Sequence, residues 1–297
     1  MPLFVSTTYF GDRSRVLEAV EKLEEIGVGN IELGSNHTGN SPNELMQIVK
    51  SRSRINFIAH NYFADSDPNF VLNVASQNTK IREKSIQFIK DSVNLCQKLA
   101  IKNYTIHPGF LTDSKVVKNR GEIRNFDLQF KKRKSFKLRS QIINEAIRII
   151  EFLYKFARIR NVQLLVENEG SKTSHEFVIF SRPKELDLLK KVIGKNFLFN
   201  FNLAHASLAG IDLKDSRTFL HFYKNSLFFE ASEIQDVLDS HLPVSSEGKI
   251  YFLIKKYRSY FSKKNVILEY RNTSIKEVKK SYDLVEEILN SATPPVE

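Results

Sequence analysis

The sequence predicts an α/β protein of the (β/α)8 class, a closed TIM barrel of eight parallel strands. Eight short apolar runs with β-like composition occur along the 297 residues, and helical patterns of apolar residues lie between them. No linker rich in Pro or Gly divides the chain, and single barrels commonly reach this length. We therefore expect one barrel domain over 1–290, followed by a flexible tail at 291–297.

The predicted strands are short runs of apolar residues between the helical patterns. In chain order they cover 3–5, 30–33, 55–59, 104–106, 162–166, 197–201, 227–229 and 266–268.

The predicted helices follow from apolar residues at a period of 3.6. A helix over 15–26 places Val16, Ala19, Val20 and Leu23 on one face. A helix over 80–99 aligns Cys96 with Ile86, Ile89 and Val93, so we expect this single cysteine to be a buried apolar thiol. A helix over 275–289 aligns Val278, Tyr282, Val285 and Leu289.

Composition places the chain among ordinary globular proteins, with 41% hydrophobic and 27% charged residues. No run approaches the roughly 18 uncharged apolar residues of a membrane span. The first residues lack the basic segment and long apolar core of a signal peptide. We expect a soluble cytoplasmic protein that does not bind membranes.

The net charge of +11 is concentrated in part at 115–139, which carries ten Lys or Arg against two acids. We interpret this segment as an insertion in the barrel. It is either a lid that binds an anionic group or a solvated surface loop, and the sequence leaves both alternatives open.

Polar residues follow most of the later predicted strands. Because the ends of parallel barrel strands meet at one mouth, these residues are expected to converge. They are His60, His107, Glu167, Asn202, His205, Glu230, Asp239, His241, Glu269 and Arg271. Carboxylates and imidazoles crowded at one mouth are costly without a cation, so a divalent metal ion is the simplest explanation.

The stretch "HNYFADSDPNFVLNVASQNTKIREKSIQFIKDSVNLCQKLAIKNYTIHPG" carries four motifs in order: His-Tyr, "LN-x-AS", "KS" and "HPG". With the strand-end residues, it resembles the xylose-isomerase-like barrel superfamily. The superfamily includes sugar isomerases and epimerases, and the endonuclease IV type of abasic-site nuclease. The resemblance implies a TIM barrel over nearly the whole chain.

The nuclease branch implies a three-zinc cluster. Its matching ligands would be His60, His107, Glu167, His205, Asp239, His241 and Glu269. Two positions depart from this branch, because Asn202 replaces an aspartate and Glu230 replaces a histidine.

The sugar-isomerase branch implies one divalent ion. Its ligands would be Glu167, Asn202, Glu230 and Glu269. An all-oxygen set suits Mn or Mg better than Zn. Glu167 and Glu269 would also act as the acid/base pair for an enediolate, and the remaining strand-end residues would bind substrate: His60, His107, His205, Asp239, His241 and Arg271.

We therefore favour a metal-dependent isomerase or epimerase acting on a sugar or sugar phosphate. A zinc nuclease that binds nucleic acid and an inactive barrel with a binding role remain alternatives, and a homo-oligomer is left open. A serine hydrolase is weakly supported because no "G-x-S-x-G" elbow occurs, and no glycine-rich phosphate loop matches a nucleotide fingerprint.

Overall fold

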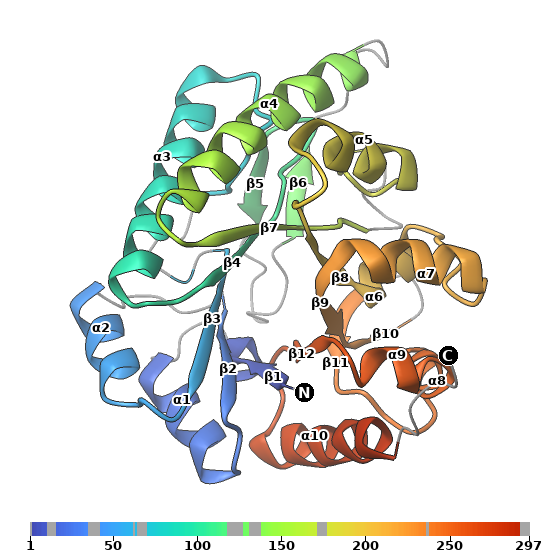
Figure 1. Ribbon diagram of the computed structural model, residues 1–297. Coiled ribbons are helices and arrows are strands. Elements are labelled where there is room, and N and C mark those ends of the chain that lie inside the picture. Colours follow the sequence, from blue (N-terminus) through green and yellow to red (C-terminus); the bar gives the residue numbers. More distant parts are fainter. Residues whose placement is uncertain are drawn as a thin grey trace.

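A computed structural model describes residues 2–10, 16–34, 42–61, 63, 70–117, 127–130, 138–170, 177–235 and 238–291. Eight parallel strands form a closed barrel surrounded by helices (Figure 1). The barrel strands are β1 (Leu3–Ser6), β2 (Asn30–Leu33), β3 (Asn56–His60), β4 (Asn103–Ile106), β7 (Gln163–Glu167), β8 (Phe199–Asn202), β9 (Ser226–Ala231) and β12 (Asn265–Leu268). They are neighbours in this order, and β12 closes the barrel on β1. The predicted fold is confirmed.

The helices follow the strands and pack their apolar faces on the outside of the barrel. They are α1 (Val16–Glu25), α2 (Pro42–Lys50), α3 (Thr79–Lys98), α4 (Leu138–Arg158), α5 (Pro183–Ile193), α6 (Leu203–Leu208), α7 (Ser216–Asn225), α8 (Lys249–Lys256), α9 (Arg258–Phe261) and α10 (Ile275–Asn290), with a 3-10 turn η1 (Thr7–Phe10). The three helices predicted from periodicity correspond to α1, α3 and α10, and Cys96 is buried as expected. Within the described ranges, no helix is long and apolar enough to cross a membrane.

The barrel interior has an apolar layer with a polar layer above it. The apolar layer consists of Phe4, Ile58, Leu165, Phe228 and Ile267, which form a buried cluster separate from the main core. Residues two apart on a strand point to the same face, so the next inward positions toward the strand ends belong to Ser6, His60, Glu167, Glu230 and Glu269. The alternation of each strand thus builds an apolar floor and sets polar side chains on it.

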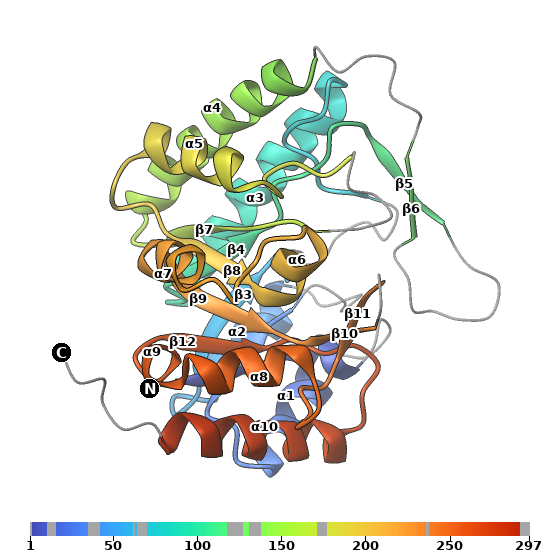
Figure 2. The same cartoon turned by 90° about the vertical axis from the view of Figure 1, so that its right-hand side faces the viewer.

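Two antiparallel hairpins extend the loops after β4 and β9. The first pairs β5 (Ser114–Val117) with β6 (Asp127–Phe130), and the second pairs β10 (Glu233–Gln235) with β11 (Leu238–Leu242). Figure 2 shows both hairpins on the same side of the barrel, with β5–β6 projecting from it. The first hairpin lies inside the predicted insertion at 115–139 except for Ser114, which precedes it. The rest of that insertion up to 137, and the predicted tail after 291, lie outside the described residues.

Candidate metal centre at the barrel mouth

The first cluster at the mouth consists of His60, His107 and Glu167, whose ligand atoms all lie within 4.8 Å of one another. His60 and Glu167 end β3 and β7, and His107 directly follows β4. Oε2 of Glu167 lies 3.0 Å from Nε2 of His60 and 3.5 Å from Nε2 of His107. Nε2 of His60 and Oε2 of Glu167 are buried, and neither has a hydrogen-bond partner among the described residues.

The second cluster consists of His205, Asp239 and His241. His205 lies on α6, the short helix that begins directly after β8, and the other two residues lie on β11. Oδ2 of Asp239 lies 3.1 Å from Nε2 of His205 and 3.0 Å from Nε2 of His241. The two clusters adjoin, because Oε1 of Glu167 lies 3.0 Å from Nδ1 of His205.

Asn202 separates Glu167 from a deeper carboxylate, Glu230. Its Nδ2 donates hydrogen bonds to Glu167 Oε1 at 2.9 Å and to Glu230 Oε2 at 3.0 Å. Its Oδ1 accepts the backbone N–H of His205 at 3.0 Å and so caps α6. The amide therefore presents N–H groups, not an oxygen ligand, to the two carboxylates.

Several buried polar side chains lie beneath the first cluster. Nδ1 of His60 lies 3.6 Å from Glu32 Oε1 and 3.8 Å from Glu230 Oε1, and Asn200 Nδ2 donates to Glu230 Oε1 at 3.0 Å. Burial raises the pKa of Glu32, although His60 lowers it. Burial and the charges of Glu167 and Glu269 raise the pKa of Glu230 well above its usual range. Glu230 therefore binds a proton more readily than an exposed carboxyl does.

The pKa values of the mouth histidines are raised, because carboxylates lie next to them. Burial lowers the pKa of His205, but the adjacent carboxylates of Asp239 and Glu167 outweigh burial and raise it well above its ordinary value. In the same way, burial raises the pKa of Asp239, but His241 and His205 hold it well below its usual range. Each cluster thus attracts positive charge, either as protons or as a cation.

Glu269 and Arg271 complete the mouth beside the second cluster. Oε2 of Glu269 lies 3.0 Å from Nδ1 of His241. Burial opposes ionisation of Glu269, but the cations of His241, His60 and Arg271 lower its pKa to about 2. The backbone N–H of Arg271 donates to the His241 carbonyl at 3.1 Å, and its Nε is buried without a hydrogen-bond partner in the described chain.

The second cluster fits a metal ion, as the hydrogen-bond partners of His205 show. Its Nδ1 lies 2.9 Å from the carbonyl oxygen of Asn168, which can only accept, so Nδ1 carries a hydrogen. A neutral His205 then directs its Nε2 lone pair at Asp239 Oδ2. Two lone pairs at 3.1 Å require a proton or a cation between them.

The ligand spacing fits a metal ion in both clusters. Nitrogen and oxygen ligands about 2.1 Å from one ion lie about 3.4 Å apart at tetrahedral angles. The separations in the two clusters run from 3.0 to 3.5 Å between the histidine and carboxylate atoms. Each of the two clusters could therefore hold one divalent ion.

All ten residues expected from the sequence lie at or beside the mouth. The expected oxygen-ligand set of Glu167, Asn202, Glu230 and Glu269 stays a prediction. The described residues form other groups that could hold a metal ion, namely the two clusters above and a third of Glu32, His60 and Glu230. Glu233, the first residue of β10, has a structural role, because its carboxylate accepts the N–H groups of Ile250 and Tyr251 at the start of α8.

Sequence reasoning missed three polar residues of the mouth. Glu32 is a fully buried acid inside the predicted second strand, which is itself an available signal. Glu169, two residues after Glu167, lies 2.8 Å from Nδ1 of His107. Asn168 exchanges two hydrogen bonds with the backbone of Asn202, at 2.7 and 3.0 Å, and no sequence pattern points to it.

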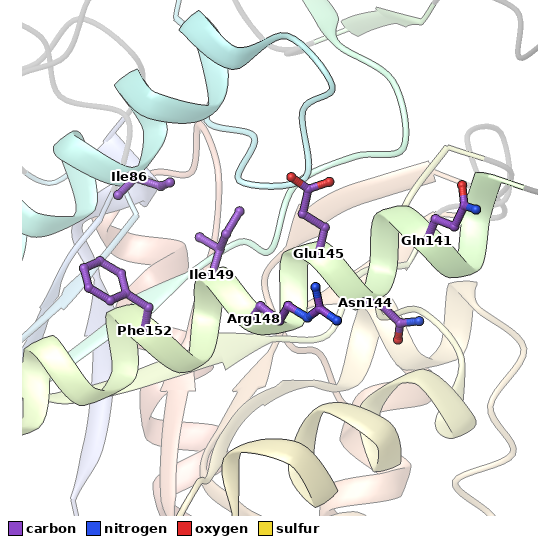
Figure 3. Close-up of a pocket in the computed structure, with 7 residues that line it drawn as sticks. All are labelled: Ile86, Gln141, Asn144, Glu145, Arg148, Ile149 and Phe152. Atoms are coloured by element: carbon purple, nitrogen blue, oxygen red, sulfur yellow. The ribbon is translucent and has the colours of Figure 1, made fainter.

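A surface groove lies apart from the mouth, between α3 and α4 on the outside of the barrel (Figure 3). Its lining residues are Ile86, Gln141, Asn144, Glu145, Arg148, Ile149 and Phe152. These side chains come from the two helices alone, so the groove contains no strand-end residue.

Similarity to solved structures extends over nearly the whole chain. A D-tagatose 3-epimerase-like protein superposes with a TM-score of 0.74 at 18% identity, covering 98% of this chain and 97% of that one. The IOLI protein with a bound zinc atom gives 0.68 at 12% identity, covering 99% of each chain. Endonuclease IV from Thermus thermophilus gives 0.62 at 15% identity, covering 98% of this chain and 100% of the other. At these identities the likeness establishes the fold alone.

Sequence comparison identifies the family. An uncharacterized protein of Methanocaldococcus jannaschii is 25% identical over 299 residues, covering 97% of this chain and 100% of the relative. The family model described as xylose isomerase-like TIM barrel matches residues 20–288. The chain belongs to the xylose isomerase-like TIM barrel family.

Proposed function

We propose that the protein is a metal-dependent enzyme whose mouth holds two divalent ions and that it hydrolyses a phosphate ester. The observation that carries this proposal is the pair of adjoining His/carboxylate clusters. Glu167 and His205 join them through their 3.0 Å contact. Two neighbouring ions suit the displacement of an oxygen at phosphorus, where attacking and leaving oxygens both need stabilisation.

The ligand chemistry favours zinc or another transition metal over Mg. Each cluster offers two imidazole nitrogens and one carboxylate, whereas the single Mn or Mg ion expected from the sequence rested on an all-oxygen set. When bound, such ions lower the pKa of water toward neutrality and neutralise charge on phosphate oxygens.

The protein's own residues would orient the substrate and exclude water from the bottom of the site. Asp239 is the most exposed ligand of the two clusters, with 28% of its side chain accessible. It is therefore the ligand that a substrate entering the mouth would reach first. The apolar floor of Phe4, Phe228 and their neighbours closes the bottom of the site to water.

A phosphate group also fits the charge of the molecule. The backbone of Arg271 is hydrogen-bonded to His241 of the second cluster, and its Nε has no hydrogen-bond partner in the described ranges, so its guanidinium could bind phosphate oxygens. The net charge of +11 and the basic insertion after β4 would attract an anionic substrate. The substrate is accordingly a phosphate monoester or diester, including a sugar phosphate or a nucleic-acid backbone.

Sugar isomerisation is the second candidate. It is supported by the convergence of Glu167, Glu230 and Glu269 in the polar layer of the mouth, where two carboxylates could exchange a proton with a sugar carbon. Against it stands the amide of Asn202, which presents N–H groups where the one-ion site needs an oxygen. The solved neighbours include proteins of both kinds and do not choose between them.

One set of assays separates the candidates. The metal-loaded protein is tested with p-nitrophenyl phosphate, bis-p-nitrophenyl phosphate and abasic duplex DNA, and with ketohexoses and their phosphates in D2O. We expect phosphate-ester hydrolysis that falls at least about 100-fold in His205→Asn and Asp239→Asn. The control is His221→Asn, which alters an exposed histidine paired with Asp187 on the outside. Deuterium incorporation into a sugar without phosphate release would instead establish the isomerase.

A further inference from the structure

The turn after β7 contacts both clusters. Glu167 is a member of the first cluster, and the next residues, Asn168, Glu169 and Gly170, each touch a histidine of the mouth. We propose that Glu169 is a positioning residue that selects the tautomer of His107 and so directs its Nε2 at the first cluster. This inference rests on the proposed metal centre.

The contact between Glu169 and His107 determines where the imidazole hydrogen lies. Oε1 of Glu169 is 2.8 Å from Nδ1 of His107, and Glu169 is only 7% exposed. A carboxylate oxygen accepts, so the hydrogen of the neutral ring lies on Nδ1. Nε2 then carries a lone pair and can bind a metal ion.

The opposite nitrogen of the same ring faces the cluster. Nε2 of His107 lies 3.5 Å from Oε2 of Glu167, the same oxygen that Nε2 of His60 approaches at 3.0 Å. Glu167 also accepts hydrogens, so it competes with Glu169 for the one hydrogen of the ring. The closer contact at 2.8 Å favours Glu169, and without it the hydrogen would move to Nε2 and block the ligand position.

The same turn orients the second cluster in a parallel way. The carbonyl oxygen of Asn168 at 2.9 Å, together with Oε1 of Glu167 at 3.0 Å, holds the hydrogen of His205 on Nδ1. Gly170 keeps the turn against α6, because a Cβ there would lie 1.9 Å from the carbonyl oxygen of His205. A carboxylate on one histidine and a backbone carbonyl on the other thus prepare both Nε2 atoms. Glu169 is the partner that substitution can remove without also removing a proposed ligand or altering the backbone.

The test measures the tautomer and the metal affinity separately. Long-range 1H–15N spectra of metal-free protein, at a pH where the imidazoles are neutral, should show the His107 hydrogen on Nδ1. In Glu169→Ala it should move to Nε2, while Asp187→Ala, which removes the exposed carboxylate beside His221, should leave His107 unchanged. Zinc titrations against a chelator should show that Glu169→Ala binds the ion of the first cluster about 10–100-fold more weakly. The affinity of the second cluster should not change.

Glu169→Gln separates tautomer from charge, since its side-chain oxygen still accepts. It should retain the Nδ1 hydrogen and most of the zinc affinity. The proposal would be overturned if Glu169→Gln lost as much zinc affinity as Glu169→Ala. It would also be overturned if the His107 tautomer were unchanged in Glu169→Ala. If wild-type protein bound no zinc, the proposed metal centre would fail, and the tautomer spectra would still decide the role of Glu169.

Discussion

Replacing Asn202 by aspartate would test the arrangement of the mouth directly. The amide nitrogen of Asn202 lies 2.9 Å from one carboxylate oxygen and 3.0 Å from another, on Glu167 and Glu230. Asn202→Asp keeps the shape of the side chain but exchanges a donor of two hydrogen bonds for a third acid. In metal-free protein the variant must therefore repel its neighbours or bind a proton.

The size of the effect follows from these distances. Two unit charges about 3 Å apart repel by about 5 kcal/mol at an effective dielectric constant of about 20. Binding one proton costs less free energy than this repulsion, because protonating a carboxyl with an ordinary pKa near 4 costs about 4 kcal/mol at pH 7. A protonated acid also donates only one hydrogen bond, and the lost one costs about 1–3 kcal/mol. We expect a loss of about 5–7 kcal/mol at pH 7.

The pH dependence has a definite sign. The introduced carboxyl has a higher pKa in the folded protein than in the unfolded one, so the folded variant binds more protons and becomes more stable as pH falls. The cost of protonation should shrink to about 2 kcal/mol at pH 5.5. Asn202→Ala is the control, because it loses both hydrogen bonds without adding a titratable group.

The assay is urea unfolding in EDTA at pH 7 and pH 5.5, with wild type and both variants. The difference between Asn202→Asp and wild type should narrow at the lower pH, and the difference for Asn202→Ala should change much less. Equal stability of Asn202→Asp and wild type at pH 7 would refute the placement of this amide between two carboxylates.

Three further predictions concern the turn, a helix end and proton competition. Gly170→Ala forces a Cβ to within 1.9 Å of the His205 carbonyl, so its melting temperature should fall, whereas Gly29→Ala meets no atom within 4 Å and should be nearly neutral. Ser274→Ala removes the capping box that Ser274 forms with Glu277 at the start of α10 and should cost about 1 kcal/mol in urea unfolding. Zinc affinity of the second cluster should fall from pH 8 to pH 6 by roughly tenfold per pH unit for each proton displaced, because the raised histidine pKa values make protons stronger competitors. Affinity that does not change with pH, measured by competition titration, would contradict this.

The fold was accessible from the sequence because most barrel strands are short runs rich in apolar residues, with a polar residue at the strand end or directly beside it. Phe228 and Glu230 illustrate this: alternation places both inside the barrel, one on the floor and the other at the mouth. The strand ends therefore identified the mouth residues without any knowledge of their contacts.

The grouping of these residues was not accessible, because it depends on side-chain directions set by local backbone. The oxygen of Asn202 is taken up by the first turn of α6, which begins directly at the end of β8, and only the amide nitrogen is left for the carboxylates. The role of Glu169 depends on a contact across 62 residues to His107. No spacing rule in a single sequence connects these positions.

Metal content tests the central claim most directly. The protein is purified without added chelator, loaded with zinc, dialysed, and measured by elemental analysis together with anomalous diffraction from its crystals. We predict two ions per chain, one among His60, His107 and Glu167 and one among His205, Asp239 and His241. A single ion bound by the carboxylates of Glu230 and Glu269, or no ion at the mouth, would contradict the two-ion centre.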